Sequence, residues 1–271
     1  MARRTTSGAQ AASDRPAASI AGEQNKLDEV ARAAASVDHR HANYKPFGPV
    51  WGSSYFTKWA VIAHALFELG LQEGATVLDV GMGGGWTTIF LSETGYDATG
   101  VDIAPANIAV SRRRAERYGS PARFEAADMD TLDLGRTFDA VLVFDALHHS
   151  VRQREVIRRL AMHVKPGGWV LFGEPSWLHS ISPHARRTTR DLGWVERGIV
   201  LRTLKRDCRD AGLPEFRRFY EGTSPFTTRS TGFAWQLMRL IGAQLNVSPG
   251  TSLWLAARRD DAATDQCISR R

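Results

Sequence analysis

The chain has 271 residues, of which 43% are hydrophobic and 24% are charged. This composition is that of an ordinary globular protein, with room for one large α/β domain and additions or for barely two small domains. No apolar run approaches the length of a membrane span, no apolar segment follows the basic N-terminus, and Cys208 and Cys267 have no metal-ligand spacing. These features argue against a membrane-spanning or secreted chain and predict a reduced, cytoplasmic protein.

The formal net charge of +6 is distributed unevenly. Residues 174–260 sum to +6, whereas the rest of the chain sums to zero. Arg accounts for most of the 35 basic residues, which favours a solvated, Arg-rich surface. The alternative is a surface that attracts a negatively charged substrate.

The N-terminal region divides into two parts. Residues 1–36 are rich in Ala, Ser, Thr and Gly, and we expect a disordered tail. Residues 37–70 are aromatic-rich and are expected to form an N-terminal cap. Apolar side chains from Phe56 to Phe67 fall on one helical face, and Gly70 ends the pattern. This indicates a helix that packs against the edge of a sheet.

A glycine-rich stretch follows the first predicted strand. Val77, Leu78 and Val80 form a short apolar run of the kind that is buried on both faces of a sheet. Glycines then occur at 81, 83, 84 and 85, and a helical pattern resumes over residues 87–92. A strand, a tight turn and a helix start are therefore predicted, where backbone approaches a ligand closely.

Three features decide which ligand suits this turn. A phosphate-binding loop of the Walker type needs a Lys at its end, and none occurs between Lys58 and Lys165. A dinucleotide fingerprint needs a third Gly where this chain has Trp86. Asp79 precedes the turn and would repel a pyrophosphate, but it suits a ligand that carries an ammonium and a sulfonium.

The pattern of strand and helix continues to residue 175. The second strand, 98–101, ends in Asp102, 21 residues beyond Gly81, which is the spacing of a carboxylate that meets ribose hydroxyls. A helix is predicted over 105–118, with Arg112, Arg113, Arg114 and Arg117 expected to be solvated. Further elements are the strands 122–126, 138–145 and 169–173 and the helix 151–163.

Beyond Glu174 the pattern weakens. Residues 176–200 show no clear strand and are expected to be an insertion over the active site. A helix is predicted over 201–211, strands over 215–220 and 252–257, and a second lid over 222–250 with a helix at 233–243. Residues 261–271 indicate a polar tail.

Five motifs occur in an order that resembles the class I S-adenosylmethionine-dependent methyltransferases. They are Asp79-Val80-Gly81-Met82-Gly83-Gly84-Gly85, Val101-Asp102-Ile103, Ala127-Asp128-Met129, the strand Phe138 to Asp145, and Val164-Lys165-Pro166-Gly167-Gly168. The resemblance covers roughly residues 70 to 175 well. It implies an α/β fold with a Rossmann-like, doubly wound, seven-stranded sheet. That sheet is mostly parallel with an antiparallel last strand, and it carries lid insertions. Residues 37–260 would form this domain, with the cofactor-binding core at 71–175.

The resemblance also implies a cofactor, S-adenosyl-L-methionine, and residues that bind it. An acid at Asp128 would accept a hydrogen bond from the adenine amino group, and Met129 would meet the ring. The nearby Asp130 and Asp133 are expected at the surface. In this family the segment before the first strand often covers the site, so Tyr44, Trp51 and Tyr55 are candidates to line it or to be core residues. The predicted cofactor-binding set is Asp79, Gly81, Gly83, Gly85, Asp102, Ile103, Asp128, Met129, Phe144 and Asp145.

The catalytic candidates lie at strand ends. His148 and His149 follow the fourth strand, at the edge where ligands bind in a doubly wound sheet. A histidine there suits a general base for a hydroxyl acceptor, and His149 is preferred by its match to the family; both histidines being structural is an equal alternative. Glu174 would orient the acceptor or the base, or else pair with an Arg. No dense ligand cluster is visible in the sequence, so no metal is expected.

A small-molecule acceptor, methylated at a hydroxyl oxygen, is the preferred interpretation. Nucleic acid is the rival acceptor because of the positive charge. However, the residues after the fourth strand, Asp145-Ala146-Leu147-His148, lack the Asn/Asp-Pro-Pro-Tyr/Phe tetrapeptide of enzymes that methylate base amines, and no nucleic-acid-binding module is visible. A non-catalytic nucleotide-binding domain is a further alternative. The aromatic residues of the lids, Trp177, Trp194, Phe226, Phe233 and Trp235, favour a hydrophobic or glycosylated acceptor. The sequence predicts no oligomeric state.

Overall fold

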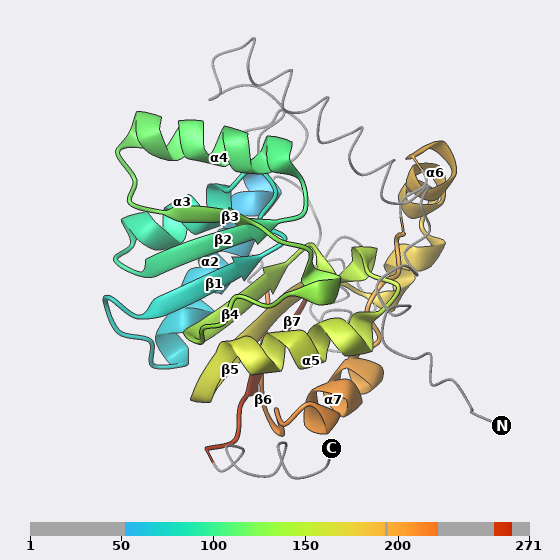
Figure 1. The fold of residues 1–271 in the computed structure, drawn as a ribbon. Helices are drawn as coiled ribbons and strands as arrows, with labels where there is room; N and C mark the ends of the chain where they lie inside the picture. The colour runs from blue at the N-terminus through green and yellow to red at the C-terminus, as the bar shows by residue number, and fades with distance from the viewer. Residues whose placement is uncertain (1–51, 193–194, 222–251, 262–271) are drawn as a thin grey trace, which may run out of the picture.

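The computed structural model describes residues 52–192, 195–221 and 252–261 (Figure 1). The predicted N-terminal tail, residues 37–51 of the N-terminal cap, the lid at 222–250 and nearly all of the C-terminal tail lie outside these ranges. Among the site candidates, the same holds for Tyr44 and Trp51. Within the described ranges, no helix has the length and apolarity that crossing a membrane requires.

One seven-stranded sheet organises the described chain, in the order β3-β2-β1-β4-β5-β7-β6. Strands β1 to β5 pair in parallel, and β7 runs antiparallel to both β5 and β6. The strands are β1 Thr76–Val80, β2 Asp97–Asp102, β3 Arg123–Ala126, β4 Phe138–Phe144, β5 Val164–Pro175, β6 Glu215–Phe219 and β7 Ser252–Arg258. This confirms the predicted fold class.

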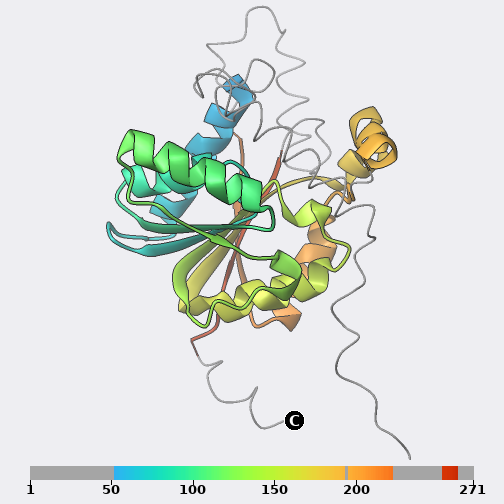
Figure 2. The ribbon, with the colours of Figure 1, turned by 45° about the horizontal axis from the view of Figure 1, so that its top comes forward.

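The continuous apolar strands divide their side chains between two cores because successive residues point to opposite faces. On β1, Leu78 and Val80 join the core under α5 (Gln153–His163) and α7 (Leu201–Asp210). Val77 joins the core under α2 (Gly52–Glu68) and α3 (Trp86–Glu93) on the other face. Figure 2 shows α5 and α7 on one side of the sheet and α2 with α4 (Pro105–Tyr118) on the other.

Two regions differ from their predicted structure. Strand β5 begins at Val164, five residues before the predicted start, because Val164 pairs with Phe138 and the register shifts before Ala140 meets Trp169. The insertion after β5 contains the short helix η3 (Trp177–Ile181) and the helix α6 (Pro183–Leu192). The chain then returns to the sheet through a parallel bridge between Ser176 and Ile199.

Candidate cofactor and acceptor site

In the glycine turn between β1 and α3, the backbone of Gly81 lies close to Ala146 in the loop after β4. Gly81 has φ 73°, and a Cβ there would lie 2.4 Å from the Cβ of Ala146. Gly83 has φ 56°, but a Cβ at this position would meet nothing within 4 Å. Gly81 is therefore required by the packing of the turn against the loop after β4. Gly83 borders open space that a ligand can approach.

Two side chains from neighbouring elements hold the turn. The carboxylate of Asp102, at the end of β2, accepts a hydrogen bond from the Gly83 amide at 2.8 Å. The guanidinium of Arg114, on α4, donates to the Gly84 carbonyl at 2.9 Å. Arg114 is only 6% exposed, so the prediction that it is solvated is wrong. The reason is that this face of α4 packs beneath the glycine turn.

Asp102 keeps one hydrogen-bonding position for a ligand. One of its oxygens accepts from the Ala104 amide at 2.9 Å and the Asn107 side chain at 3.1 Å, and the other accepts from Gly83. An ionised carboxylate has about four acceptor positions. The oxygen that binds Gly83 can therefore accept from one ribose hydroxyl. A bidentate contact to both hydroxyls would need the turn to shift.

Asp79 is buried below the same turn. Its carboxylate accepts hydrogen bonds from the hydroxyl of Thr87 and, at 2.7 Å, from that of Thr88, both in the first turn of α3. Burial raises the pKa of Asp79 to about 6, against the lowering effect of the two hydroxyls, and the charge of Asp102 adds to the rise. Asp79 thus fixes the start of α3 and places negative charge behind the turn.

The loop after β3 carries the predicted adenine-binding pair. Asp128 caps the short helix η1 (Met129–Thr131) by accepting from the Asp130 amide at 3.0 Å, and Met129 is buried. Asp130 was expected at the surface, which is wrong. It is 7% exposed and accepts from the Ser150 hydroxyl at 2.6 Å. This bond ties the loop after β3 to the loop after β4.

An aromatic wall lines the end of β4. The rings of Tyr55 and Trp86 meet that of Phe144 edge to face, and Trp254 stacks on Phe144 with centroids 5.6 Å apart. The Tyr55 hydroxyl donates to the Asp145 carboxylate at 3.2 Å. The ring of Tyr55 therefore belongs to the core, while its hydroxyl reaches the candidate site. Both alternatives for this residue, a core position and a position lining the site, hold in part.

Asp145 itself has φ 55°, the single positive φ among the described non-glycine residues. Its amide donates to the Gly173 carbonyl at 2.9 Å. The chain turns sharply there, and the turn carries the two histidines that follow. Of the other predicted cofactor residues, Gly85 caps α3 with φ 73°, and Ile103 is half-buried next to Asp102.

Glu174 is the organising acid of the acceptor side. It is fully buried at the end of β5, and one oxygen accepts from the amides of Ala146 at 3.0 Å and Leu147 at 2.8 Å. Its other oxygen lies 2.8 Å from Nδ1 of His148. The predicted pairing of Glu174 with an Arg is thus wrong, and its predicted role in orienting a histidine fits these contacts.

A second acid approaches the same histidines from the segment after α6. Oε2 of Glu196 lies 3.6 Å from Nε2 of His148 and 2.6 Å from Nε2 of His179. Nδ1 of His149 lies 2.9 Å from the Val195 carbonyl oxygen. We call His148, His149, His179, Glu174 and Glu196 the histidine–carboxylate cluster. It contradicts the expectation that no dense group of ligands forms.

The two neighbouring imidazoles differ electrostatically. Burial alone would lower the pKa of His148, but the hydrogen bond and charge of Glu174, with Asp145 and Glu196, raise it on balance. Burial and the charge of His148 lower the pKa of His149 to about 3. The preference for His149 as the base stays a prediction. The buried carboxylate of Glu174 is paired with His148.

The comparisons with known proteins agree with this geometry. A family model described as a methyltransferase domain matches residues 77–168, which span the glycine turn, Asp102, Asp128 and both histidines. These residues form a class I S-adenosylmethionine-dependent methyltransferase domain.

Relatives of the methyltransferase domain are found among curated proteins and solved structures. The chain is 29% identical over 153 residues to the ubiquinone biosynthesis O-methyltransferase of Bordetella avium, covering 55% of this chain and 60% of that protein. It is 35% identical over 96 residues to the protein of the same name from Paramagnetospirillum magneticum, covering 35% and 39%. The chain thus spans at most about three fifths of these relatives. The magnesium protoporphyrin IX methyltransferase of Synechocystis PCC 6803, with bound SAH, has a TM-score of 0.60 at 16% identity, covering 89% of this chain and 98% of that one.

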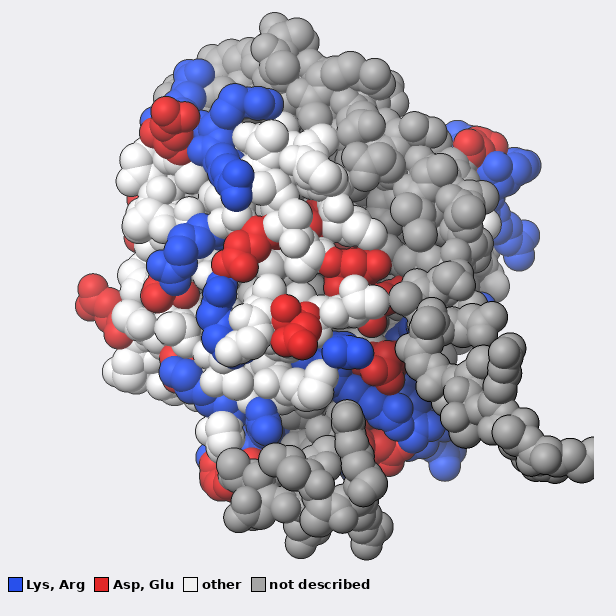
Figure 3. Space-filling model, in the orientation of Figure 1, with Lys and Arg blue, Asp and Glu red and all other residues white. Residues whose placement is uncertain are grey.

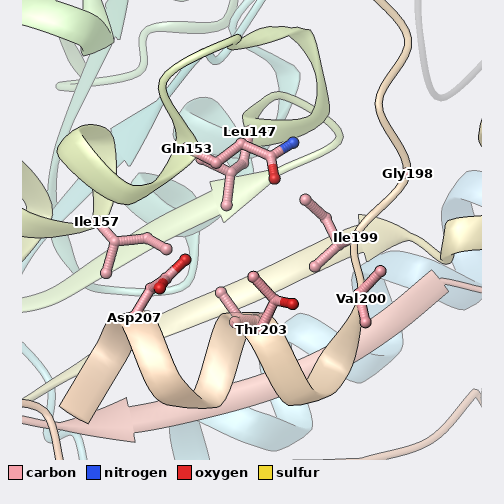
Figure 4. Close-up of a pocket in the computed structure, with 9 residues that line it drawn as sticks. Leu147, Gln153, Ile157, Gly198, Ile199, Val200, Thr203 and Asp207 are labelled. Atoms are coloured by element: carbon pink, nitrogen blue, oxygen red, sulfur yellow. The ribbon is translucent and has the colours of Figure 1, made fainter. Parts of the chain in front are cut away.

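A small cavity of about 70 Å³ lies outside the methyltransferase site, between α5 and α7 (Figure 4). Leu147, Ile157 and Leu204 contribute apolar walls, and Asp207 lies at its edge. Pockets that bind small molecules have volumes of about 300–1,000 Å³, so this cavity is too small for a nucleoside. The candidate site is therefore the set of side chains at the carboxyl edge of the sheet and not this cavity.

Proposed function

We propose that this chain transfers a methyl group from S-adenosylmethionine to a hydroxyl oxygen of a small molecule. The observation that carries the proposal is the buried His148–Glu174 pair, 2.8 Å apart, at the end of β4 and next to the cofactor turn. The O-methyltransferase names of the curated relatives support the same chemistry. The chain covers only part of those proteins, so the acceptor is proposed only as a class.

The cofactor would be held along the carboxyl ends of β1, β2 and β3. Asp102 binds a ribose hydroxyl through its remaining acceptor position, and Asp128 with Met129 takes the adenine edge. Gly83 lets the methionine part approach the backbone, because no atom would lie within 4 Å of a Cβ there. Asp79, behind the turn, favours a ligand with an ammonium group over a pyrophosphate.

The acceptor would lie beside the histidine–carboxylate cluster. Bound S-adenosylmethionine supplies a methyl group that is already activated by its sulfonium. The protein therefore has to align the acceptor oxygen, exclude water and provide for the loss of the hydroxyl proton. His148 is held by Glu174 for this last task. The aromatic wall of Tyr55, Trp86 and Phe144 excludes water from the side of α2.

Nucleic acid is the less favoured acceptor. Figure 3 shows Lys and Arg interspersed with Asp and Glu over the face that carries α4 and α5, without a continuous basic surface there. Several of the described basic residues are paired, such as Arg123 with Asp97 and Arg136 with Glu125. A long polyanion needs many phosphate contacts, and its binding falls steeply with salt. A small acceptor would show shallow salt dependence.

The test is methyl transfer from tritiated donor to a panel of hydroxylated small molecules and to bulk tRNA and DNA. We expect turnover on a small molecule that is lost in His148→Ala and reduced in Glu174→Gln, while both variants still bind S-adenosylhomocysteine. His64→Ala, which removes an exposed histidine on α2, is the matched control and should be fully active.

Two outcomes would contradict the proposal. Robust labelling of RNA that falls with rising salt and is indifferent to His148 would favour a nucleic-acid methyltransferase. Tight cofactor binding with no transfer to any acceptor in the panel would favour a non-catalytic nucleotide-binding domain.

A further inference from the structure

The histidine–carboxylate cluster brings together more ligand groups than proton transfer requires. Within the described residues, one ligand atom each from His148, His149 and Glu196 lies within 4.8 Å of the other two. The rings of His148 and His149 have centroids 3.9 Å apart. The histidines come from the loop after β4 and Glu196 from the segment after α6, so the fold builds this group from separate parts of the chain.

Both histidines are oriented in the way that metal-binding histidines are. Nδ1 of His148 faces the Glu174 carboxylate at 2.8 Å, and Nδ1 of His149 faces the Val195 carbonyl at 2.9 Å. Since a carbonyl oxygen only accepts and a carboxylate at this distance accepts from an imidazole, each Nδ1 carries the proton. In the neutral form of each ring, the lone pair is then on Nε2. A carboxylate or a backbone carbonyl on the other ring nitrogen is the usual support of a histidine that binds a metal.

The position of Glu196 fits a shared cation better than a hydrogen bond to His148. Its Oε2 is 3.6 Å from Nε2 of His148, which exceeds hydrogen-bonding range. Two ligands on one tetrahedral zinc, each about 2.0–2.1 Å from the metal, lie about 3.3–3.4 Å apart. Glu196 is in turn bound by Nε2 of His179 at 2.6 Å, and carboxylates that bind metals are themselves commonly hydrogen-bonded.

Burial strengthens this argument. Glu174 is fully buried and Glu196 is 9% exposed, and their hydrogen-bond partners among the described residues are imidazoles and backbone amides. Buried carboxylates are normally paired with cations or coordinate metals. A divalent cation between the two imidazoles and Glu196 would add positive charge beside these two buried acids.

We propose that His148, His149 and Glu196 bind one divalent transition-metal ion through two imidazole nitrogens and one carboxylate oxygen. Imidazole ligands favour Zn²⁺, Co²⁺, Ni²⁺ or Fe²⁺ over Mg²⁺ and Ca²⁺, which prefer oxygen. Three protein ligands leave a coordination position for an oxygen of water or of an acceptor. Glu174 and His179 are positioning residues, because they act through His148 and Glu196.

The role of the cation, unlike its binding, rests on the proposed function. A bound divalent cation lowers the pKa of a coordinated hydroxyl, so the hydroxyl proton leaves to solvent and the oxygen that attacks the methyl carbon is already ionised. In the loaded protein His148 therefore holds the metal, and the metal replaces the imidazole as the group that activates the acceptor.

The test titrates the full chain, stripped of metal by chelation, with Co²⁺ followed by its visible absorption, and then with Zn²⁺ as a competitor. We expect one equivalent bound, with the Co²⁺ spectrum of nitrogen and oxygen ligands. Glu196→Gln and His149→Ala should weaken Co²⁺ binding at least about tenfold, and Glu174→Gln by about 10- to 100-fold. His64→Ala is the control. Circular dichroism and binding of S-adenosylhomocysteine establish that each variant is folded.

The outcomes separate this inference from the proposed function. No stoichiometric uptake by the wild-type chain, or equal uptake by folded Glu196→Gln, would overturn the metal site. Full methyl transfer by the metal-free chain would overturn the catalytic role of the cation and leave the proposed function standing. Stoichiometric uptake by a chain that transfers no methyl group would support the site and contradict the proposed function.

Discussion

The carboxylate of Asp79 should make the fold less stable as the pH rises. Asp79 is 1% exposed, and its pKa is raised by burial from 3.8 to about 6. Between these values the folded chain binds more protons than the unfolded chain, so the free energy of unfolding falls with rising pH. Each pH unit corresponds to about 1.4 kcal/mol, and above pH 6 the ionised Asp79 costs about 3 kcal/mol.

Asp79→Asn is the perturbation that isolates this effect. The amide has the same shape and keeps an oxygen for the hydroxyls of Thr87 and Thr88, but it carries no charge. We expect the variant to be more stable than the wild type by up to about 3 kcal/mol at pH 7.5, and the difference to vanish near pH 3.5, where both side chains are neutral. Urea unfolding from pH 3.5 to pH 8 measures it.

Asp139→Asn is a control of opposite sign. Partial burial raises the pKa of Asp139, but hydrogen bonds from Thr76 and Lys165 outweigh it and lower the pKa on balance. The ionised Asp139 stabilises the fold at neutral pH, and this stabilisation is lost as the pH falls through the lowered pKa of Asp139. Asp139→Asn should therefore be less stable than the wild type at pH 7.5. If the difference in free energy of unfolding between Asp79→Asn and the wild type does not change with pH, the reasoning for Asp79 is refuted.

Two further substitutions test the cofactor turn. Asp102→Ala should weaken binding of S-adenosylhomocysteine by about 1.5–3 kcal/mol, the range for hydrogen bonds to a charged group, and calorimetry that finds an unchanged affinity in a folded variant would show that Asp102 does not contact the ligand. Gly81→Ala should destabilise the fold by about 2–5 kcal/mol in urea unfolding, because left-handed backbone costs about 1–2 kcal/mol and overpacking against the loop after β4 adds about 1–3 kcal/mol. Gly74→Ala, with φ 79° and no atom within 4 Å of a Cβ, should lose the backbone part alone, and equal losses in the two variants would contradict the packing argument.

The fold was predictable because its signals are local. The strands around Leu78 and Val141 are short apolar runs, and the glycines after Val80 mark a turn wherever they occur. The acids at 79, 102 and 128 lie at or just beyond the carboxyl ends of β1, β2 and β3, so parallel pairing alone places them at one edge. Their positions could be predicted from the sequence, whereas the internal hydrogen bonds of Asp79 and Asp102 depend on how the turn packs.

The acceptor side was less predictable because tertiary packing assembles it. Glu196 lies in a segment with no strand or helix pattern, and long-range contacts such as the bridge between Ser176 and Ile199 bring that segment back to the sheet. Arg114 and Asp130 were misplaced at the surface, since charge alone indicates solvation. A buried partner such as the Gly84 carbonyl is not visible in the sequence.

Calorimetry on the full chain with S-adenosylhomocysteine and, separately, with NAD tests the central claim most directly. The claim is that the glycine turn, with Asp79 behind it and Trp86 after it, selects an S-adenosyl ligand over a dinucleotide. We expect binding of S-adenosylhomocysteine at one equivalent per chain and no measurable heat with NAD. Tight binding of NAD, with none of S-adenosylhomocysteine or S-adenosylmethionine, would contradict it.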